Sequence, residues 1–262
     1  MENCKAKIEI RNVSKVFGKG AKSVVALDDV NLEIPENKFT TIVGPSGCGK
    51  STLLYMLAGF EKPSGGEILL DGKLIDKPAP DRGFVFQDFA LFPWRTVLGN
   101  VTFGLTTNGR SKKEAKEIAM EYINLVNLSG FEHAYPHTLS GGMKQRVAIA
   151  RALAYDPEVL LMDEPFGALD AQTRKYMQKE LVDIWDKLNK TVVFVTHSVI
   201  EAVHLSDIIV VLTARPGKVK GIISADIPRP RKSTNDDFLA IRKHTLDLLE
   251  EEVQKEIKMD HL

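Results

Sequence analysis

The sequence has no excess of charge of either sign, because 35 lysines and arginines balance 35 aspartates and glutamates among 262 residues. Proteins that bind nucleic acids through phosphates usually carry a basic excess, so this balance argues against a nucleic-acid partner. Cysteine is also scarce. Cys4 and Cys48 stand far apart and match neither a disulfide framework nor a metal-ligand spacing. A reducing, cytosolic compartment is the simpler interpretation.

Long hydrophobic runs are missing as well. The run 208–212 is among the longest, and it has the length of a strand rather than of a membrane span. The N-terminal Met-Glu-Asn-Cys-Lys lacks the basic segment and the apolar core of a signal peptide. We therefore expect any function at a membrane to depend on a partner protein.

Hydrophobic periodicity predicts an α/β fold, and the chain is long enough for one substantial core with a smaller insert. Val30, Leu32 and Ile34 alternate with polar residues, which predicts an antiparallel sheet near the N-terminus. Near-continuous apolar runs predict buried strands of a parallel sheet, at 39–43, 159–162, 191–195 and 208–212. Helices are predicted over about 50–58 and 171–188.

The segment from about 91 to 155 has a mostly helical pattern and is interpreted as an inserted subdomain. Ser111 and Glu114 form a capping box. The apolar face expected for the helix that follows consists of Ile118, Ala119, Tyr122, Leu125 and Val126. Another helix is predicted to begin after Ser140 and to stop before Asp156.

We interpret 1–232 as a single domain that contains this insert, and 233–262 as a helical tail. The tail spaces Phe238, Ile241, Leu248 and Leu249 as a helix face does, with Thr245 interrupting the stripe. This face is expected to pack on the body of the protein or on a second copy of it.

Residues 44–51 match the pattern G-x-x-x-x-G-K-[ST] between a predicted strand and a predicted helix. In such a loop, successive backbone N–H groups and the helix N-terminus bind phosphates. Lys50 would reach the β and γ phosphates, and the Ser51 hydroxyl would bind Mg²⁺. The residues predicted to bind nucleotide here are Gly44, Pro45, Ser46, Gly47, Cys48, Gly49, Lys50 and Ser51. A thiol at a helix N-terminus is expected to be reactive, and bound ATP should protect Cys48 from alkylation.

Asp163 and Glu164 follow the apolar strand at 159–162, at the edge where α/β sheets bind ligands. Asp163 would hold the hydration shell of Mg²⁺, and Glu164 would polarise the attacking water. An acidic pair alone could equally be a helix cap or part of an ion pair, but the phosphate loop upstream favours catalysis. His197 ends another strand and could donate a hydrogen bond to the γ-phosphate, although a lone histidine is more often structural.

Three further features suit a nucleotide site. Gln87 lies between a strand-like segment and the helical insert, where it could sense both. Phe17 could stack on a purine ring, or it could be a core aromatic of the first sheet. The turn at 140–142, Ser-Gly-Gly, opens a helix and supplies a second anion site. If two copies met face to face, this turn would complete the partner's site.

Taken in order, these motifs resemble the nucleotide-binding subunit of an ATP-binding cassette (ABC) transporter over essentially the whole chain. The resemblance implies a P-loop NTPase core with a mostly parallel sheet, an N-terminal antiparallel β subdomain and an inserted α-helical subdomain. It identifies 44–52 as Walker A, 139–145 as the signature motif, 159–163 as Walker B and 168–170 as the D-loop. Met143 stands where many relatives have Gln, and Phe17 where many have Tyr.

The resemblance also implies the role of each site residue. Catalysis is assigned to Lys50, Gln87, Glu164 and His197. Mg²⁺ is assigned to Ser51, Gln87 and Asp163. Besides residues 44–51, nucleotide binding is assigned to Phe17, Thr52, Ser140, Gly141, Gly142, Gln145 and Asp170. The expected cofactors are therefore ATP and Mg²⁺.

Shorter motifs look like those of bacterial importers of nitrate, sulfonates or taurine, namely 81–83, 89–94, 213–217 and 227–231. This similarity implies an ATP-hydrolysing subunit at the cytoplasmic face of the inner membrane. Its expected partners are a second copy of itself, a separate permease and, indirectly, an extracytoplasmic solute-binding protein. Leu91 and Trp94 are candidates for contact with the permease, and packing inside the insert is the alternative for both.

The main alternative is an ABC ATPase that never meets a permease, such as the one that assembles iron–sulfur clusters. The importer-like motifs count against it. Relatives in DNA repair and chromosome structure carry a long coiled coil or a zinc insert between the Walker motifs, and this sequence has neither. Ribosome-associated relatives normally hold two cassettes, and the signature motif excludes a general nucleotide kinase.

Overall fold

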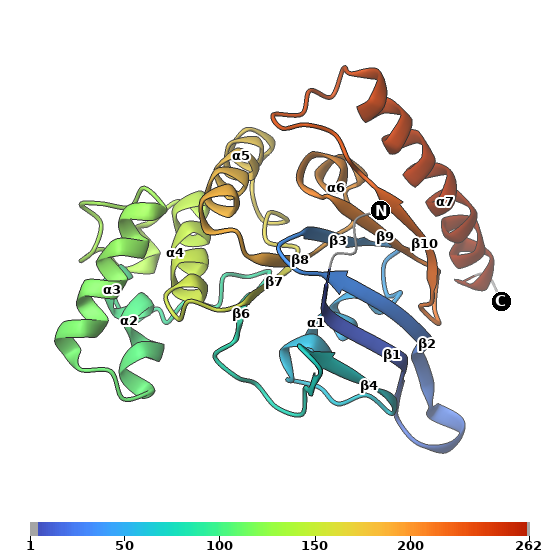
Figure 1. Ribbon diagram of the computed structural model, residues 1–262, viewed down its shortest axis with the longest axis horizontal. Helices are drawn as coiled ribbons and strands as arrows, with labels where there is room; N and C mark the ends of the chain where they lie inside the picture. The colour runs from blue at the N-terminus through green and yellow to red at the C-terminus, as the bar shows by residue number, and fades with distance from the viewer. Residues whose placement is uncertain (1–4, 261–262) are drawn as a thin grey trace. The chain divides into compact units, whose positions relative to one another are not determined.

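The computed structural model describes residues 5–260. The chain divides into two compact units, Met1–Ala79 with Thr191–Leu262, and Pro80–Lys190 (Figure 1). Among the described residues, no helix combines the length and the apolar character that a bilayer crossing requires.

The first unit begins with the predicted antiparallel sheet. Its strands are β1 (Ala6–Phe17), β2 (Val24–Pro35), β4 (Gly65–Leu70) and β5 (Lys73–Leu74), in the order β2-β1-β4-β5. The short 3₁₀ helix η1 (Gly20–Lys22) lies between β1 and β2. Val30, Leu32 and Ile34 are all buried, as their alternation predicted.

A second set of strands in this unit is mostly parallel. β3 (Phe39–Val43) pairs in parallel with both β8 (Thr191–Thr196) and β9 (Ile208–Leu212). The predicted buried runs at these strands are therefore confirmed. The edge strand β10 (Val219–Ser224), which the sequence reading did not predict, pairs antiparallel with β9. The helices of the unit are α1 (Lys50–Ala58), α6 (Val199–Leu205) and α7 (Asp236–Asp260).

The C-terminal helix α7 packs on its own unit, which confirms the first of the two expectations for the tail. The helix lies beside α6 and β10 (Figure 1). Phe238 is buried in a cluster with residues of α6, β9 and β10, and Ile241, Leu248 and Leu249 pack against that cluster. Thr245 does not break the buried face, because its side chain is buried and its hydroxyl donates to Ile241 O at 2.8 Å.

The segment before α7 is held by a buried arginine. The Arg231 guanidinium donates to four carbonyl oxygens, those of Val203, Ser206, Ala225 and Ile227. Burial lowers the pKa of Arg231 to about 10. These bonds fix the start of the tail on the C-terminal end of α6.

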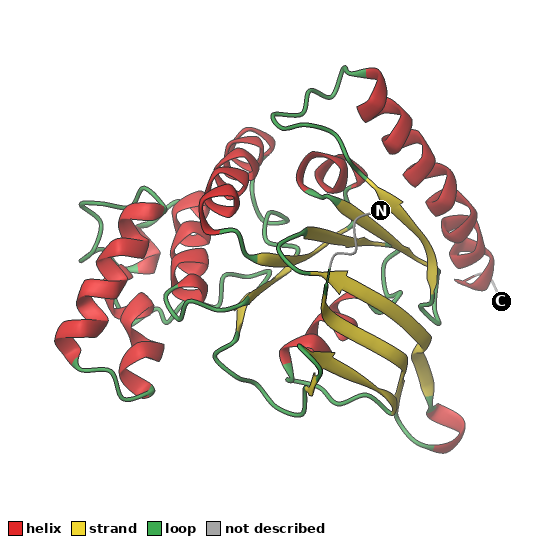
Figure 2. Cartoon of the chain, viewed as in Figure 1, coloured by secondary structure: helices red, strands yellow, loops and turns green. Residues whose placement is uncertain are grey.

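The second unit contains the parallel strands β6 (Arg82–Val85) and β7 (Val159–Asp163) and most of the helices (Figure 2). The helices are α2 (Val97–Thr107), α3 (Lys112–Leu125), η2 (Pro136–Thr138), α4 (Gly141–Leu153) and α5 (Ala171–Leu188). The predicted helix starts are confirmed: Ser111 and Glu114 form the capping box of α3, and the Ser140 side chain accepts from Met143 N at the start of α4.

The predicted buried face of α3 is partly wrong. Ala115, Ala119 and Ile123 form its buried residues. Ile118 and Tyr122 are only half-buried, because they line a pocket rather than the packed core. Periodicity alone cannot separate a core face from a pocket wall, since both are apolar.

Candidate functional site

The phosphate loop of the first unit joins β3 to α1, as predicted. The Lys50 side chain turns back over the loop, and its ammonium donates to Gly44 O and Pro45 O, each at 2.8 Å. Gly49 is the N-cap of α1 and has no side chain to cap the first turn. An anion is the ligand that such a helix start binds.

The Cys48 thiol is fully buried, 3.8 Å from the Lys50 ammonium. The sequence reading placed it correctly at the helix start but gave no sign of its burial. A reagent reaches this sulfur only when the loop opens, so the alkylation rate of Cys48 measures loop opening.

His197 leaves the sheet beside the phosphate loop. Val43 of β3 pairs with Thr196 of β8 in parallel register, so Gly44 and His197 follow from the same strand edge. The turn after β8 is fixed by Thr196, whose hydroxyl donates to Glu201 at 2.6 Å and accepts from Ser198 N at 3.0 Å. His197 itself is exposed.

Phe17 is not a core aromatic. Its side chain is 42% exposed at the end of β1, and the Lys15 ammonium lies 5.0 Å from the ring centroid. The core alternative is therefore wrong. An exposed ring with a cation over one face is compatible with stacking on a base, and that role stays a prediction.

The second unit carries the acidic pair. Val85 pairs with Met162 in parallel register, so Gln87 and Glu164 follow from the same strand edge. A Cβ placed on Gly167 would lie 3.8 Å from Gln87 Nε2 and 3.9 Å from Glu164 Oε2. The ends of both side chains therefore lie beside Gly167.

Asp163 and Glu164 have different environments. Asp163, the last residue of β7, is 3% exposed. Glu164 has a φ of 41°, a conformation that L-residues with side chains rarely adopt. Such strain persists where the surrounding structure enforces it, and it aims a side chain to a particular place.

The Ser-Gly-Gly turn opens α4 against the start of α5. A Cβ on Gly142 would lie 2.9 Å from Thr173 Cγ2, and one on Gly141 would lie 3.2 Å from Leu169 Cδ2. Asp170 caps α5 by accepting from Gln172 N and Thr173 N, and hydrogen bonds from Thr173 lower the pKa of its carboxyl. Asp170 thus has a structural role that the sequence reading missed, and its contact with nucleotide stays a prediction.

Gln145 is fully buried on the inner face of α4. Neither its Oε1 nor its Nε2 has a hydrogen-bond partner within the described part of the chain. Its assignment to nucleotide binding stays a prediction.

No group of three or more His, Cys, Asp or Glu side chains within residues 5–260 could hold a metal ion by itself. The donors predicted for Mg²⁺ fit a different arrangement. The Ser51 hydroxyl and the Asp163 carboxylate are hard oxygen ligands, and Mg²⁺ is commonly bound by one or two such groups together with substrate phosphates.

Arg151 is a site residue that the sequence reading missed. It lies in the last turn of α4, and its guanidinium donates to Phe89 O at 2.9 Å and to Ala90 O. Phe89 and Ala90 have φ values of 62° and 46°, so the loop after Gln87 is strained and clamped. Burial lowers the pKa of Arg151. The signal in the sequence was an arginine inside an otherwise apolar helix face.

The sequence from 27 to 167 matches the family model described as "ABC transporter". The chain is 57% identical to an uncharacterized ABC transporter ATP-binding protein of Methanocaldococcus jannaschii, over 98% of this chain and 96% of that protein. It is 46% identical to the aliphatic sulfonates import ATP-binding protein SsuB of Bacillus cereus, over 93% of this chain and 96% of that protein.

The fold is similar to that of a solved ATP-binding cassette, determined as a dimer in a post-hydrolysis state with ADP and Pi. The TM-score is 0.73 at 35% identity, covering 84% of this chain and 100% of the other. The α/β fold expected from the sequence is thereby confirmed, with its antiparallel sheet, mostly parallel core strands and helical insert.

The Arg151 clamp predicts that Arg151→Met loosens the loop after Gln87. Losing hydrogen bonds from a charged donor should raise hydrogen exchange at 88–91 and lower ATP turnover about tenfold, with ATP affinity nearly unchanged. Arg151→Lys should restore only part of the lost ATP turnover and exchange protection, because an ammonium cannot reproduce the two-pronged guanidinium geometry. Unchanged exchange in a folded Arg151→Met protein would refute the clamp.

Proposed function

The chain belongs to the ABC transporter family as an ATP-binding subunit that hydrolyses ATP for transport, and we propose that it drives an importer of a small anion of the nitrate or sulfonate class. The supporting observation is the 46% identity to an aliphatic sulfonates import protein, which extends over 93% of this chain. The short motifs at 89–94, 213–217 and 227–231 support the same subfamily.

We propose that two copies enclose two ATP molecules. Each ATP would lie between the phosphate loop of one copy and the Ser-Gly-Gly turn at 140–142 of the other. The dimer of the solved relative with ADP and Pi supports this arrangement. The positive N-terminus of α4 would face the γ-phosphate, so that hydrolysis removes the charge that joins the copies.

In the proposed site, Lys50 neutralises the β and γ phosphates, and Phe17 stacks on the adenine. Mg²⁺, held by Ser51, Asp163 and Gln87 together with phosphate oxygens, would supply charge neutralisation on the transferred phosphoryl group. Glu164 orients and polarises the attacking water. The placement of both side-chain ends beside Gly167 supports their joint action, since a Cβ on Gly167 would lie within 4 Å of each.

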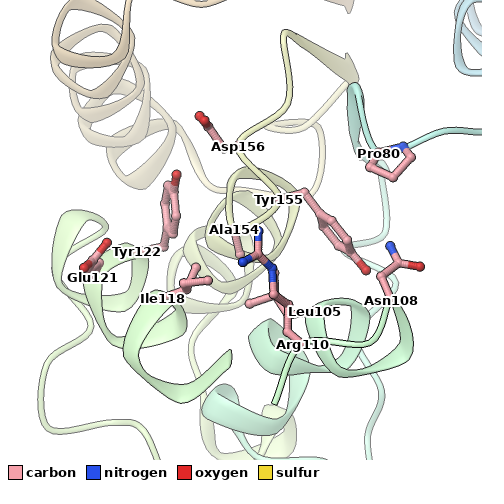
Figure 3. A pocket seen from close by; sticks show the side chains of 10 residues that line it. All are labelled: Pro80, Leu105, Asn108, Arg110, Ile118, Glu121, Tyr122, Ala154, Tyr155 and Asp156. Atoms are coloured by element: carbon pink, nitrogen blue, oxygen red, sulfur yellow. The ribbon is translucent and has the colours of Figure 1, made fainter. Parts of the chain in front are cut away.

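The second unit contains a pocket of about 490 Å³ in its helical part (Figure 3). Leu105, Ile118 and Ala154 form its apolar part, and the half-buried Tyr122 and Tyr155 add aromatic surface. Asn108, Arg110, Glu121 and Asp156 line the rest with polar and charged groups. Burial raises the pKa of both tyrosines, so their hydroxyls remain protonated donors. A pocket with both apolar and charged walls suits an amphipathic helix of a partner protein.

We propose that a short cytoplasmic helix of the permease docks in this pocket. Trp94 does not line the pocket, but it is 71% exposed, which argues against packing inside the insert and leaves it open to a second contact with the permease. Its ring lies 5.7 Å from that of Phe92. The protein would then work peripherally at the cytoplasmic face of the membrane, and any extracytoplasmic binding protein would act through the permease.

Glu164→Gln should bind ATP with near-normal affinity and lower turnover by about 10²-fold or more, the contribution of a positioned general base. The comparison is Glu158→Gln, which removes an exposed carboxylate just before the same strand and should retain turnover. Steady-state ATPase assays and equilibrium binding measure both. Near-normal turnover of Glu164→Gln would remove Glu164 from the catalytic role.

Tagged Glu164→Gln protein, held in ATP and Mg²⁺, should capture a polytopic permease from gently solubilised source membranes. Adding Tyr122→Ala and Trp94→Ala should reduce the captured permease about tenfold, as expected for two aromatic anchors. The control adds Phe131→Ala instead. Phe131 is an aromatic residue of the same unit that is 46% exposed, and its loss should leave the amount of captured permease unchanged. Recovery of soluble assembly proteins alone would overturn the importer assignment in favour of an ATPase that works without a permease.

A further inference from the structure

A carboxylate of the C-terminal helix is buried against the turn that follows β9. Glu252 is 1% exposed, and its Oε2 accepts a hydrogen bond from Ala214 N at 3.0 Å. Its Oε1 accepts from the Lys220 ammonium at 2.8 Å. A buried carboxylate is unfavourable unless such partners compensate for its lost hydration. Glu252 therefore joins α7 to the turn and to β10 with defined geometry.

Lys220 has a second acidic partner of a different kind. Glu251 lies 2.6 Å from the same ammonium, but its side chain is 70% exposed. Burial acts to lower the pKa of Lys220, and the hydrogen bonds to Glu251 and Glu252 outweigh it, so that the pKa is raised. Lys220 thus remains charged between one buried and one exposed carboxylate, and the buried one also accepts from Ala214 N.

The turn itself is closed by its own hydrogen bonds. Thr213 N donates to Lys218 O, Lys218 N donates to Thr213 Oγ1, and Thr213 Oγ1 donates to Pro216 O, each at 2.9 Å. These bonds tie the two ends of the turn together. A displacement at Ala214 would therefore be transmitted toward Gly217.

The other side of the turn rests on the phosphate loop. A Cβ placed on Gly217 would lie 2.1 Å from Cys48 O, so the bare Cα is packed against the loop backbone. Gly217 N donates to Ala26 O at 2.9 Å, and Asp28 N donates to Gly217 O at 3.1 Å. The turn is thus held between β2 and the phosphate loop at one end and by Glu252 at the other.

We propose that Glu252 is a positioning residue for the phosphate loop, acting through the 213–218 turn. With α7 docked, the turn supports the backbone at Cys48 in the conformation that receives phosphates. Release of α7 from this contact lowers ATP affinity without any change at the nucleotide site itself. The proposal rests on ATP binding by this loop, and it does not depend on the permease or on the transported solute.

Cys48 provides a direct reporter, because its buried thiol reacts only when the loop opens. In a Cys4→Ser background, where Cys48 is the one remaining cysteine, its alkylation by iodoacetamide is timed without nucleotide. The set comprises the parent, Glu252→Ala, Glu252→Gln and the matched control Glu251→Ala. KM for ATP and kcat are measured on the same proteins with Cys48 unmodified.

Glu252→Ala should alkylate about tenfold faster and raise KM for ATP about tenfold with kcat little changed, since a hydrogen bond to a charged acceptor is lost. Glu252→Gln keeps an acceptor for Ala214 N, so its alkylation rate and its KM for ATP should lie between those of Glu252→Ala and the parent. Glu251→Ala removes the exposed partner of Lys220 and leaves the bond from Ala214 N to Glu252 in place, so its alkylation rate and KM should match those of the parent.

Hydrogen exchange is measured on residues 212–218 and on α7, to show whether each substitution loosens the turn and whether α7 stays folded. Faster exchange at 212–218 with parent-like alkylation and KM would overturn the proposal, as would equal effects of Glu251→Ala and Glu252→Ala. If Glu252→Ala unfolds α7 altogether, the test uses Glu252→Gln with an intact α7. Its alkylation rate and KM are then compared with those of the parent and of Glu251→Ala. A wrong importer assignment would leave all these rates unchanged, because the assay contains no permease.

Discussion

The structure depends on holding one short piece of backbone, residues 44–49, in a conformation that presents N–H groups to phosphate. Such a loop has few side chains with which to stabilise itself. Neighbouring parts of the structure stabilise it. The loop is anchored between β3 and α1, and the Lys50 ammonium donates hydrogen bonds to Gly44 O and Pro45 O. The Cα of Gly217 packs against the loop backbone so closely that any side chain at this position would collide with Cys48 O.

In the second unit, strained backbone is held in place by a partly buried cation. Glu164 and the loop residues Phe89 and Ala90 all have positive φ values. These conformations cost energy and persist because their surroundings hold them. Arg151 holds the loop after Gln87 by two carbonyl bonds, and it extends from the helix that the Ser-Gly-Gly turn begins. Helix α4 and the loop after Gln87 are therefore linked by hydrogen bonds within one unit.

The tail shows how a peripheral element can act on a central one. Apolar packing around Phe238 attaches α7 to its unit, and Arg231 fixes the segment before it. Hydrophobic contact is non-directional and only brings the helix near. The directional part is supplied by Glu252, whose two oxygens meet the backbone of the 213–218 turn and the Lys220 ammonium. Burial makes these bonds sensitive to the exact docking of the helix.

The amino-acid sequence by itself did not predict the edge strand β10, but it did predict the buried parallel strands, the helix starts at Ser111 and Ser140, the phosphate loop and the family. These are local features, because periodicity, caps and glycine spacing act over a few neighbouring residues. It could not decide whether Phe17 was buried, nor which face of α3 was core, since Ile118 and Tyr122 look like core residues until a pocket is seen beside them.

Only the tertiary structure revealed the contacts of Arg151 and Glu252, and the burial of Cys48. Arg151 meets Ala90 across 61 positions of sequence, and Glu252 meets Ala214 across 38. A charged side chain in a helix is ordinarily solvated, and nothing in the local pattern says that it will be buried against a distant backbone group. That outcome depends on which surfaces the packed chain brings together.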